Sequence, residues 1–424
     1  MAERIAPSDA IWLQDSDTNP MMINAVIVTD RLSLRVLRGA FQRRIFAGAQ
    51  AGRFERLRCR VAGAGHGRRW EPDPDFDLAR HIVARGGKAL ASMEAVRGYV
   101  GREVSRRLDP AHPMWQIQLL GDVGDDASAI LVRFHHSIGD GEALVFLLLA
   151  LMDGASERRW NGAVPGHVPW LGRLLKGASI QLRAPGILLR RLAWFPDRSR
   201  VHGPALSGRK QVAWTAPLDL EVVKEARRRT GATVNDVLMA AVSGALSRYL
   251  ARSGAKAPSR FLVSMPVNVR APGTLPRCGN RFAPVPLELP AGSFPLASRI
   301  RRVKARMDEM KRGAVPVVVD ELQRSLLTFL PEALSRGVID FLANKCTAVV
   351  TNVAGPREEL ALKGRRVRSI VFWVPQRARI GLGISILSLA GKVQLGIIAD
   401  KALVPDPRVL VRAFEEQFEA LKTL

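Results

Sequence analysis

Two adjacent histidines lie between two apolar segments of different character, and this junction constrains the fold more than any other stretch. The segment before them, Ala129–Val132, is short and rich in β-branched residues, which predicts a buried strand. The segment after them, Ala143–Leu149, is longer and rich in leucine, which predicts a core helix. Asp140 and Gly141 turn the chain into that helix. Because a strand-to-helix junction can aim side chains into a cleft, we expect a functional site here.

His135 and His136 carry imidazole groups, which titrate near neutrality and can take a proton from an alcohol or a thiol. Asp140 allows two interpretations: it holds the imidazole tautomer, as in a serine-type triad, or it pairs with an arginine and fixes the turn. Gly141 lets the backbone approach closely or adopt a positive φ. With seven histidines, a shuffled chain would contain about 0.1 adjacent pairs, and requiring Asp-Gly at this offset lowers that below roughly one in a thousand.

Neither a metal site nor a disulfide framework is expected. Consecutive side chains of an extended segment point to opposite faces, so His135 and His136 cannot both bind one ion. Cys59, Cys278 and Cys346 are far apart and lack CxxC spacing, which is typical of a reducing compartment. A purely structural histidine pair, with Asp140 as a helix cap, remains an alternative to a catalytic one.

The chain reads as two α+β halves joined by a linker. Its 424 residues favour two or three domains. Residues 154–203 are rich in Pro, Gly and Arg, and we place an N-terminal domain at 1–154, a basic linker at 155–209 and a C-terminal domain at 210–424. Strands are expected at 23–28, 54–61, 114–120, 129–134, 212–218, 260–270, 279–285, 347–353, 368–374, 380–387 and 391–398, and helices at 32–46, 93–108, 219–230, 237–250, 300–311, 322–342 with a break at Pro331, and 409–424.

The formal net charge of +25 predicts an anionic partner: nucleic acid, anionic lipid or a phosphate-rich substrate. A genome rich in G and C, which favours arginine, is the alternative explanation. In the linker, Trp170–Lys176 and Gly186–Phe195 alternate apolar and basic residues, as in a helix lying in a membrane interface or one packed across both domains. The start lacks the apolar core of a signal peptide, and the apolar run Ala143–Met152 is about half of the roughly 20 residues that span a bilayer.

Further short motifs follow in a definite order: Pro7-Ser8-Asp9-Ala10, Pro20-Met21, Pro113-Met114-Trp115, Thr233–Val237, Pro266–Arg270, Gly279-Asn280, Thr351–Pro356, Asp400 and Val404-Pro405-Asp406. With the HHxxxDG pattern of His135–Gly141, they resemble the chloramphenicol-acetyltransferase-like superfamily. Within it, nearly the whole chain is similar to the bacterial wax ester synthase/acyl-CoA:diacylglycerol acyltransferase family. Departures from the family pattern are Met114 for leucine, Ala354 for proline, and Leu389 where an aromatic residue usually follows the serine.

This resemblance implies an α/β fold of two similar domains that enclose a tunnel, with the thioester entering from one face and the alcohol from the other. It makes His136 the general base, with His135 and Asp140 as its supports. We expect Arg270 to pair with Asp140. Asn235, at a helix start that Thr233 or Asn235 can cap, is a candidate for orienting the reacting groups or stabilising an oxyanion, or it is a plain cap.

The implied function is acyl-CoA-dependent O-acylation of diacylglycerol or a long-chain alcohol, giving triacylglycerol or wax esters. Acyl-CoA is then a co-substrate and no cofactor is expected. The basic surface suits both the CoA phosphates and an anionic leaflet, so we expect a cytoplasmic protein on the inner membrane or on lipid bodies. The residues that bind the substrate remain unassigned.

Two alternatives stay open. One is acylation of another hydroxyl, such as that of a polyketide or glycolipid, from CoA or a carrier protein. The other is a degenerate relative that binds lipid or nucleic acid without catalysis. The intact motif argues against degeneracy, and nucleic acid is not an expected partner because the charge is spread along the chain without a recognisable nucleic-acid-binding motif.

Overall fold

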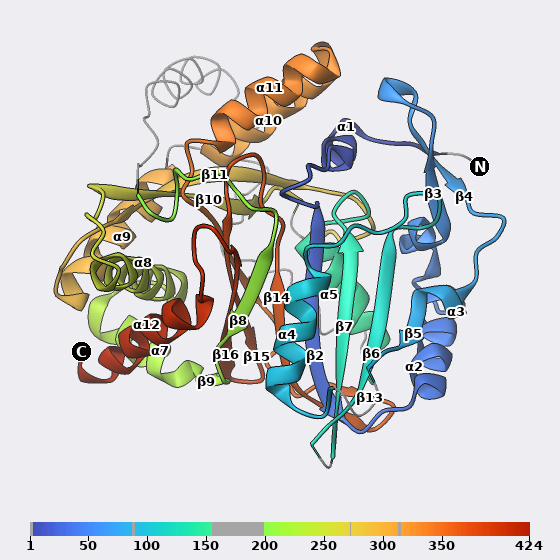
Figure 1. Cartoon of the computed structure of the whole chain (residues 1–424), viewed down its shortest axis with the longest axis horizontal. Helices are drawn as coiled ribbons and strands as arrows, with labels where there is room; N and C mark the ends of the chain where they lie inside the picture. Colours follow the sequence, from blue (N-terminus) through green and yellow to red (C-terminus); the bar gives the residue numbers. More distant parts are fainter. Residues whose placement is uncertain (1–2, 87–89, 125, 155–198, 272, 313–314) are drawn as a thin grey trace.

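The computed structural model describes residues 3–86, 90–124, 126–154, 199–271, 273–312 and 315–424. Two large mixed sheets lie side by side with helices packed on them, and a small sheet stands at one edge (Figure 1). The first large sheet has the strand order β13-β14-β2-β7-β6-β5, and the second has the order β11-β10-β12-β15-β16-β8, with β9 also paired to β16. The small sheet is β1 (Glu3–Arg4), β4 (Arg69–Pro72) and β3 (Cys59–Ala62).

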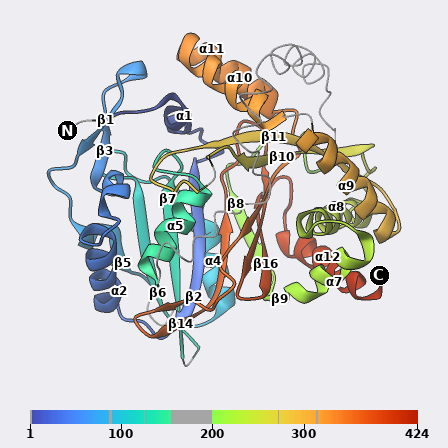
Figure 2. The same cartoon turned by 180° about the vertical axis from the view of Figure 1, so that it is seen from behind.

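The first large sheet supports the histidine pair. Its strands are β2 (Met22–Asp30), β5 (Ile82–Ala84), β6 (Trp115–Val123), β7 (Ala127–His135), β13 (Ala361–Leu362) and β14 (Arg365–Trp373). Helix α4 (Met93–Glu103) covers one face, and α2 (Leu34–Phe41) and α5 (Gly141–Leu151) cover the other (Figures 1 and 2). Successive side chains of β2 point to opposite faces of the sheet. Val26 packs against α4 on one face, and Ile27 packs toward α2 and α5 on the other.

The second large sheet carries the opposite wall of the site. Its strands are β8 (Lys210–Trp214), β9 (Leu218–Asp219), β10 (Arg260–Asn268), β11 (Phe282–Pro290), β12 (Ala348–Ala354), β15 (Leu382–Leu389) and β16 (Lys392–Asp400). The helices α7 (Leu220–Thr230), α8 (Val234–Arg252), α9 (Leu296–Arg312) and α12 (Pro407–Ala420) form one layer with it. Two further helices, α10 (Val315–Phe329) and α11 (Glu332–Ala343), project from the body in both views (Figures 1 and 2).

One strand from the predicted C-terminal half of the chain belongs to the sheet of the N-terminal half. Residues 361–373 were expected to belong with the C-terminal half, but β14 pairs antiparallel with β2, with Val371 opposite Val26. Backbone pairing with β14 satisfies an edge of β2 that would otherwise expose unpaired N–H and C=O groups, and the apolar residues of β14 join the cores on both faces of the first sheet. The two sheets therefore interlock, and the site between them is held by both parts of the chain.

Most predicted elements are present, including the helix break at Pro331, which precedes the first residue of α11. The strand expected at 54–61 is wrong in its first half, because Glu55–Arg58 form a 3-10 turn and only Cys59–Ala62 are extended. That turn brings the Arg56 guanidinium into the interior, 2.7 Å from the Asp9 carboxylate. The linker helices expected at 170–176 and 186–195 lie outside the described residues. Among the described helices, none combines the length and apolarity needed to cross a membrane.

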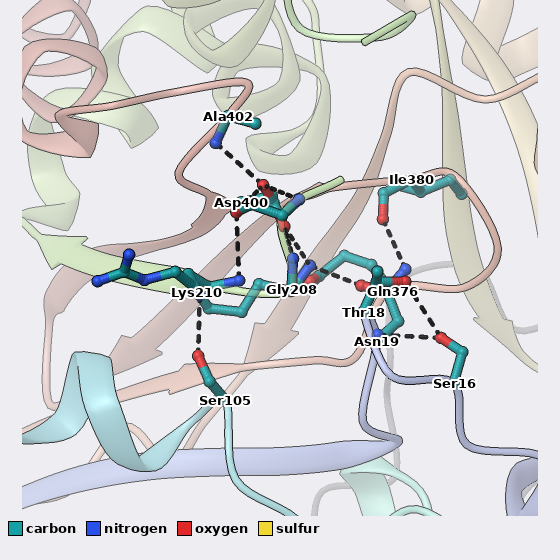
Figure 3. A network of polar contacts seen from close by, with 12 residues as sticks. Ser16, Thr18, Asn19, Ser105, Gly208, Lys210, Gln376, Ile380, Asp400 and Ala402 are labelled. Atoms are coloured by element: carbon teal, nitrogen blue, oxygen red, sulfur yellow. Dashed lines mark hydrogen bonds and ion pairs between the residues drawn. The ribbon is translucent and has the colours of Figure 1, made fainter. Parts of the chain in front are cut away.

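A buried polar network connects the segment at residues 207–210 to Asn19 and Asp400 (Figure 3). The Lys210 ammonium donates to Asn19 Oδ1 at 2.6 Å and lies 3.9 Å from the Asp400 carboxylate. Burial lowers the pKa of Lys210 to about 8, against the attraction of Asp400. Asp400 also accepts hydrogen bonds from Ser207 N, Ser207 Oγ, Gly208 N and Ala402 N. This network joins the N-terminal segment to the end of β16 and so fixes how the two sheets meet.

Candidate active site

His136 is the first residue after β7 and faces a cavity between the two sheets. The indole of Trp12 stacks on its imidazole, with ring centroids 4.0 Å apart and planes inclined by 16°. The ring of Phe282 lies on another side, with a centroid distance of 5.6 Å. The imidazole is therefore held between aromatic walls, and only 5% of the residue is exposed.

The backbone around His136 is held by both halves of the chain. Its N–H donates to the Met21 carbonyl at 2.7 Å, and its carbonyl accepts from the Asn280 amide at 2.8 Å. Asn280 also donates to the buried Asp9 carboxylate at 2.9 Å. Since Asp9 in turn pairs with Arg56, a chain of buried polar contacts sets the position of the imidazole.

The environment of His136 favours the neutral imidazole. Burial lowers the pKa of His136 from 6.5 to about 4, although the Asp140 charge, the residue's own carbonyl and the Asn280 amide oppose this shift. An imidazole with that pKa is uncharged at neutral pH, with one ring nitrogen protonated and the other free to accept a proton.

His135 points away from the cavity, as expected for consecutive residues at the end of a strand. Its Nδ1 lies 2.8 Å from Ser137 Oγ, and its Nε2 lies 2.9 Å from Asp15 Oδ2. Asp15 also accepts from the N–H of Met21, whose carbonyl holds His136. His135 thus ties the loop to the N-terminal segment instead of facing substrate.

Asp140 is joined to Arg270, as predicted: its Oδ2 lies 2.8 Å from Arg270 Nη1, and both side chains are buried. The same oxygen accepts from the Arg281 N–H at 2.8 Å, and Oδ1 caps α5 by accepting from the Ala143 N–H at 3.1 Å. These contacts go to the turn and to the second sheet, not to the His136 ring. Of the two interpretations of Asp140, the geometry supports the one in which an arginine pairs with it and the turn is fixed.

Gly141 begins α5 with a negative φ, so of the two roles considered for it, the positive φ does not apply. It lines the cavity, and a Cβ atom added there would meet no heavy atom within 4 Å. A side chain at this position would therefore extend into space beside His136. The absence of a side chain leaves room for a substrate.

Glu142 is a partly buried carboxyl group at the cavity that sequence reasoning missed. It accepts from the Asn268 amide at 2.7 Å and from Arg270 Nη1 at 3.3 Å, so it shares that guanidinium with Asp140. Burial raises the pKa of Glu142 to about 7, with Arg270 opposing the shift and the Asp140 charge adding to it. One arginine thus faces two carboxyl groups.

This arrangement predicts a pH-dependent stability. Unfolded Glu142 loses its proton near pH 4.5, whereas folded Glu142 keeps it until about pH 7, so ionisation destabilises the fold as the pH rises. Relative to the Glu142→Gln variant, the wild type should lose about 2–3 kcal/mol of unfolding free energy between pH 4.5 and pH 7.5. Denaturant unfolding of both proteins across this pH range measures the difference in unfolding free energy. If the unfolding free energies of the two proteins changed with pH in the same way, the raised pKa of Glu142 would be contradicted.

The cavity runs along β10 and β11, whose alternate residues have opposite environments. Odd-numbered residues of both strands lie in the core, while Leu262, Ser264, Pro266 and Asn268 of β10 line the cavity with Phe282, Pro284 and Pro286 of β11. From Asn268, beside Glu142, to Leu262 the strand extends about 20 Å. The other walls come from α10 and α11, through Val319, Leu322, Leu326, Ile339 and Leu342. The cavity is thus long and mainly apolar, with polar groups gathered near His136.

Asn235 does not cap α8 and does not line the cavity. Thr233 is the cap, and it forms a reciprocal capping box with Asp236. The Asn235 side chain instead accepts from the Asn352 amide at 3.0 Å, and Asn352 does line the cavity. Any influence of Asn235 on the reacting groups therefore passes through Asn352.

Trp12 and Asn280 contact His136, and Asn268 and Glu142 line the same cavity, but none of the four was singled out as a site residue. Asn280 and Asn268 lie in motifs that carried the family resemblance, another such motif ends two residues before Trp12, and Glu142 directly follows HHxxxDG. These positions in or beside the motifs were the sequence signals that could have identified them as site residues. Among the described residues, no three His, Cys, Asp or Glu side chains gather where they could hold a metal ion.

Two models of one protein family match separate parts of the chain. The model for the wax ester synthase/diacylglycerol acyltransferase catalytic domain matches residues 5–169, and the model for the WS/DGAT C-terminal domain matches residues 278–422. A probable diacylglycerol O-acyltransferase of Mycobacterium tuberculosis is 28% identical over 393 residues, covering 85% of this chain and 82% of the relative. Wax ester synthase/diacylglycerol acyltransferase 10 of Arabidopsis thaliana is 26% identical, covering 82% and 80%.

Solved structures share the two-part fold. The wax ester synthase/diacylglycerol acyltransferase from Marinobacter aquaeolei VT8 superposes with a TM-score of 0.71 at 19% identity, covering 99% of each chain. The starter condensation domain of rhizomide synthetase superposes with a TM-score of 0.63 at 15% identity, covering 100% of this chain and 94% of that one. The expected fold class is confirmed, and the chain belongs to the wax ester synthase/diacylglycerol acyltransferase family.

Proposed function

We propose that this chain transfers an acyl group from acyl-CoA to the hydroxyl of diacylglycerol or of a long-chain alcohol, with His136 as the general base. One observation carries the proposal: the buried His136 imidazole faces a mainly apolar cavity that follows strand β10 for about 20 Å. That length is roughly the length of an extended sixteen-carbon chain, at about 1.25 Å per bond of a zigzag. The names of the relatives, diacylglycerol O-acyltransferase and wax ester synthase, fit such substrates.

The reaction needs one base and no covalent enzyme intermediate. His136 takes the proton of the acceptor hydroxyl through Nε2, because its Nδ1 is buried in the protein. The hydroxyl oxygen attacks the thioester carbonyl and forms a tetrahedral intermediate. As the C–S bond breaks, the leaving thiolate of CoA takes the proton from the imidazolium, and the ester and free CoA remain.

The neighbours of His136 have distinct supporting roles in this scheme. Asp140 and Arg270 fix the turn that presents the imidazole, and Trp12 and Phe282 restrict the rotation of its ring. In this scheme Asn352, which lines the cavity, orients the reacting carbonyl, and Asn235 is a positioning residue that holds its amide. No cofactor takes part in any step.

The acceptor comes from a lipid layer in this proposal. Diacylglycerol and long-chain alcohols are too apolar to diffuse freely in water, and the net charge of +25 attracts an anionic surface as well as the phosphates of CoA. The protein therefore works at the cytoplasmic face of the membrane or on lipid bodies. Peripheral association suits a protein whose described helices include no membrane-spanning one.

Product analysis tests the substrate class. The purified protein is incubated with one long acyl-CoA, hexadecanol and diacylglycerol. The lipid products are separated, and their amounts are compared with the amount of CoA released. We expect wax ester, triacylglycerol or both, in amounts equal to the CoA. Release of CoA with free fatty acid alone, or no turnover with either acceptor, would reject the proposed acceptors.

The buried imidazole predicts an unusual pH profile. Because the pKa of His136 is lowered to about 4, the base form dominates far below neutrality. We expect kcat/KM to stay level from about pH 8 to about pH 5.5 and to fall only below about pH 5. Rates measured after brief exposure to each pH, with recovery checked at pH 7, give the profile. An acidic limb near pH 6.5 would show that the catalytic imidazole is solvated as an ordinary histidine is.

A further inference from the structure

The large apolar side chains that are exposed among the described residues gather on one pair of helices. They are Phe329 at the end of α10 and Leu334, Val338 and Phe341 on α11, with exposed fractions of 81%, 60%, 37% and 54%. Scattered exposed hydrophobic residues are ordinary, but a cluster within 13 positions marks an interaction site. We call these four residues the outer apolar patch.

Helix α11 has two apolar faces with different surroundings. Leu334, Val338 and Phe341 are spaced by four and three residues, so they share the outward face. Ile339 and Leu342 lie on the inward face and line the cavity of His136. The helix is therefore a thin wall between the outer apolar patch and the substrate cavity, and it projects from the body of the protein (Figures 1 and 2).

The charges near the outer apolar patch favour a lipid surface over water. The carboxylate of Glu332 pairs with Arg68 at 3.0 Å and that of Asp340 pairs with Arg377 at 2.6 Å, so both are neutralised toward the body. The Lys345 ammonium lies 4.7 Å from the Phe341 ring centroid. The net charge of +25 attracts the protein as a whole to an anionic layer, and the pairing of these two carboxylates lowers the repulsion between such a layer and this end.

The size of the outer apolar patch favours a lipid layer over a second copy of the chain as its partner. A stable dimer buries about 800 Å² on each partner, with roughly 20 residues a side. Four side chains at the tip of a projecting helix pair are fewer than such an interface needs. They are sufficient for shallow insertion, since aromatic and leucine side chains anchor helices at the boundary of head groups and acyl chains.

We propose that the outer apolar patch inserts into an anionic lipid layer and places the cavity wall of α10 and α11 directly against it. Apolar substrates then pass from the layer into the cavity without crossing water. This inference rests on the proposed function for the identity of the substrate, but insertion itself does not depend on catalysis. The partner is the lipid surface, and the contact is made by Phe329, Leu334 and Phe341 above all.

The test uses the full-length protein with Phe329, Leu334 and Phe341 all changed to serine. The matched control carries Ala333→Ser and Gly337→Ser, two exposed positions of the same helix that hold no large side chain. Binding is measured by sedimentation with vesicles of phosphatidylcholine containing about one third phosphatidylglycerol. We expect the triple variant to lose roughly tenfold or more in partitioning, and the control to bind as the wild type does.

Two activity assays separate this inference from the proposed function. With a short acyl-CoA and a short, water-soluble alcohol, all three proteins should turn over equally, within about twofold. With diacylglycerol in vesicles, the triple variant alone should lose about tenfold or more, in proportion to its lost binding. If no protein acylates either alcohol, the proposed function fails while the vesicle result still decides insertion.

Two results would overturn the lipid contact. One is vesicle binding by the folded triple variant that equals wild-type binding. The other is a wild-type dimer by light scattering that the triple substitution converts to a monomer while vesicle binding stays unchanged, which would assign the patch to a contact between copies.

Discussion

Replacing His136 with alanine is expected to lower kcat by about a thousandfold while the protein stays folded. A positioned general base contributes roughly 10² to 10⁴ to a rate, and neither His135 nor Asp140 is oriented to replace it, since their side chains are engaged with Asp15, Ser137 and Arg270. The truncation also removes the ring that stacks on Trp12, which leaves a space beside the indole. Steady-state release of CoA in the presence of a long-chain alcohol measures the loss.

A structural role for His136 can be separated from a chemical one. Free imidazole added to the alanine variant should enter the vacated space and restore part of the rate, with a dependence on pH that follows the added base. The same imidazole should not affect the wild type. A folded alanine variant with a wild-type rate would remove His136 from the mechanism.

Replacing Asp140 with alanine is expected to destabilise the fold by about 3 kcal/mol, the largest effect on stability that this site predicts. The substitution leaves the buried Arg270 guanidinium facing Glu142 alone, at 3.3 Å, and removes the cap of α5 and the acceptor for the Arg281 N–H. Loss of a cap alone costs about 1 kcal/mol. Denaturant unfolding of the full chain measures the sum.

The double variant Asp140→Ala, Arg270→Met identifies the source of that loss. If the guanidinium left with Glu142 as its one remaining carboxyl partner carries the cost, removing its charge should recover a large part of the stability lost in the single variant. Activity should remain low in both, because the turn that presents His136 is no longer fixed. An Asp140→Ala protein as stable as the wild type would contradict the buried ion pair.

The sequence was sufficient for local features of the site. The strand, the turn and the helix around HHxxxDG follow from aliphatic residues on each side of a short polar segment, and the break at Pro331 follows from its missing N–H. The pairing of Asp140 with Arg270 was a hypothesis made with the family resemblance and is present at 2.8 Å. The local elements depend on neighbours in the chain, and the choice of Arg270 depended on the resemblance.

Contacts between segments that are distant in the sequence could not be predicted from local patterns. The stacking of Trp12 on His136 joins residues more than 100 positions apart, and the pairing of β14 with β2 joins the two ends of the chain. Alternation along β14 shows that the strand is buried, but it does not show which sheet receives it. Many strand edges are compatible with the same pattern, and tertiary packing selects one.

Two local patterns were misleading for physical reasons. The alternation of charged and apolar residues at 54–61 is typical of a strand, yet the pairing of Arg56 with Asp9 requires a tight turn there. Asn235 stands at a helix start, where asparagine often caps, but Thr233 and Asp236 form the reciprocal capping box. That spacing was present in the sequence and would have indicated the correct cap.

Acceptor-dependent release of CoA tests the central claim most directly, because His136 as a base for the acceptor excludes an acyl-enzyme. Enzyme at high concentration is mixed with a long acyl-CoA, with and without hexadecanol, and CoA release and intact protein mass are followed within one turnover. The proposed mechanism predicts CoA release only with the alcohol, ester equal to CoA, and an unchanged protein mass. One equivalent of CoA released without alcohol, together with a protein heavier by one acyl group, would contradict it.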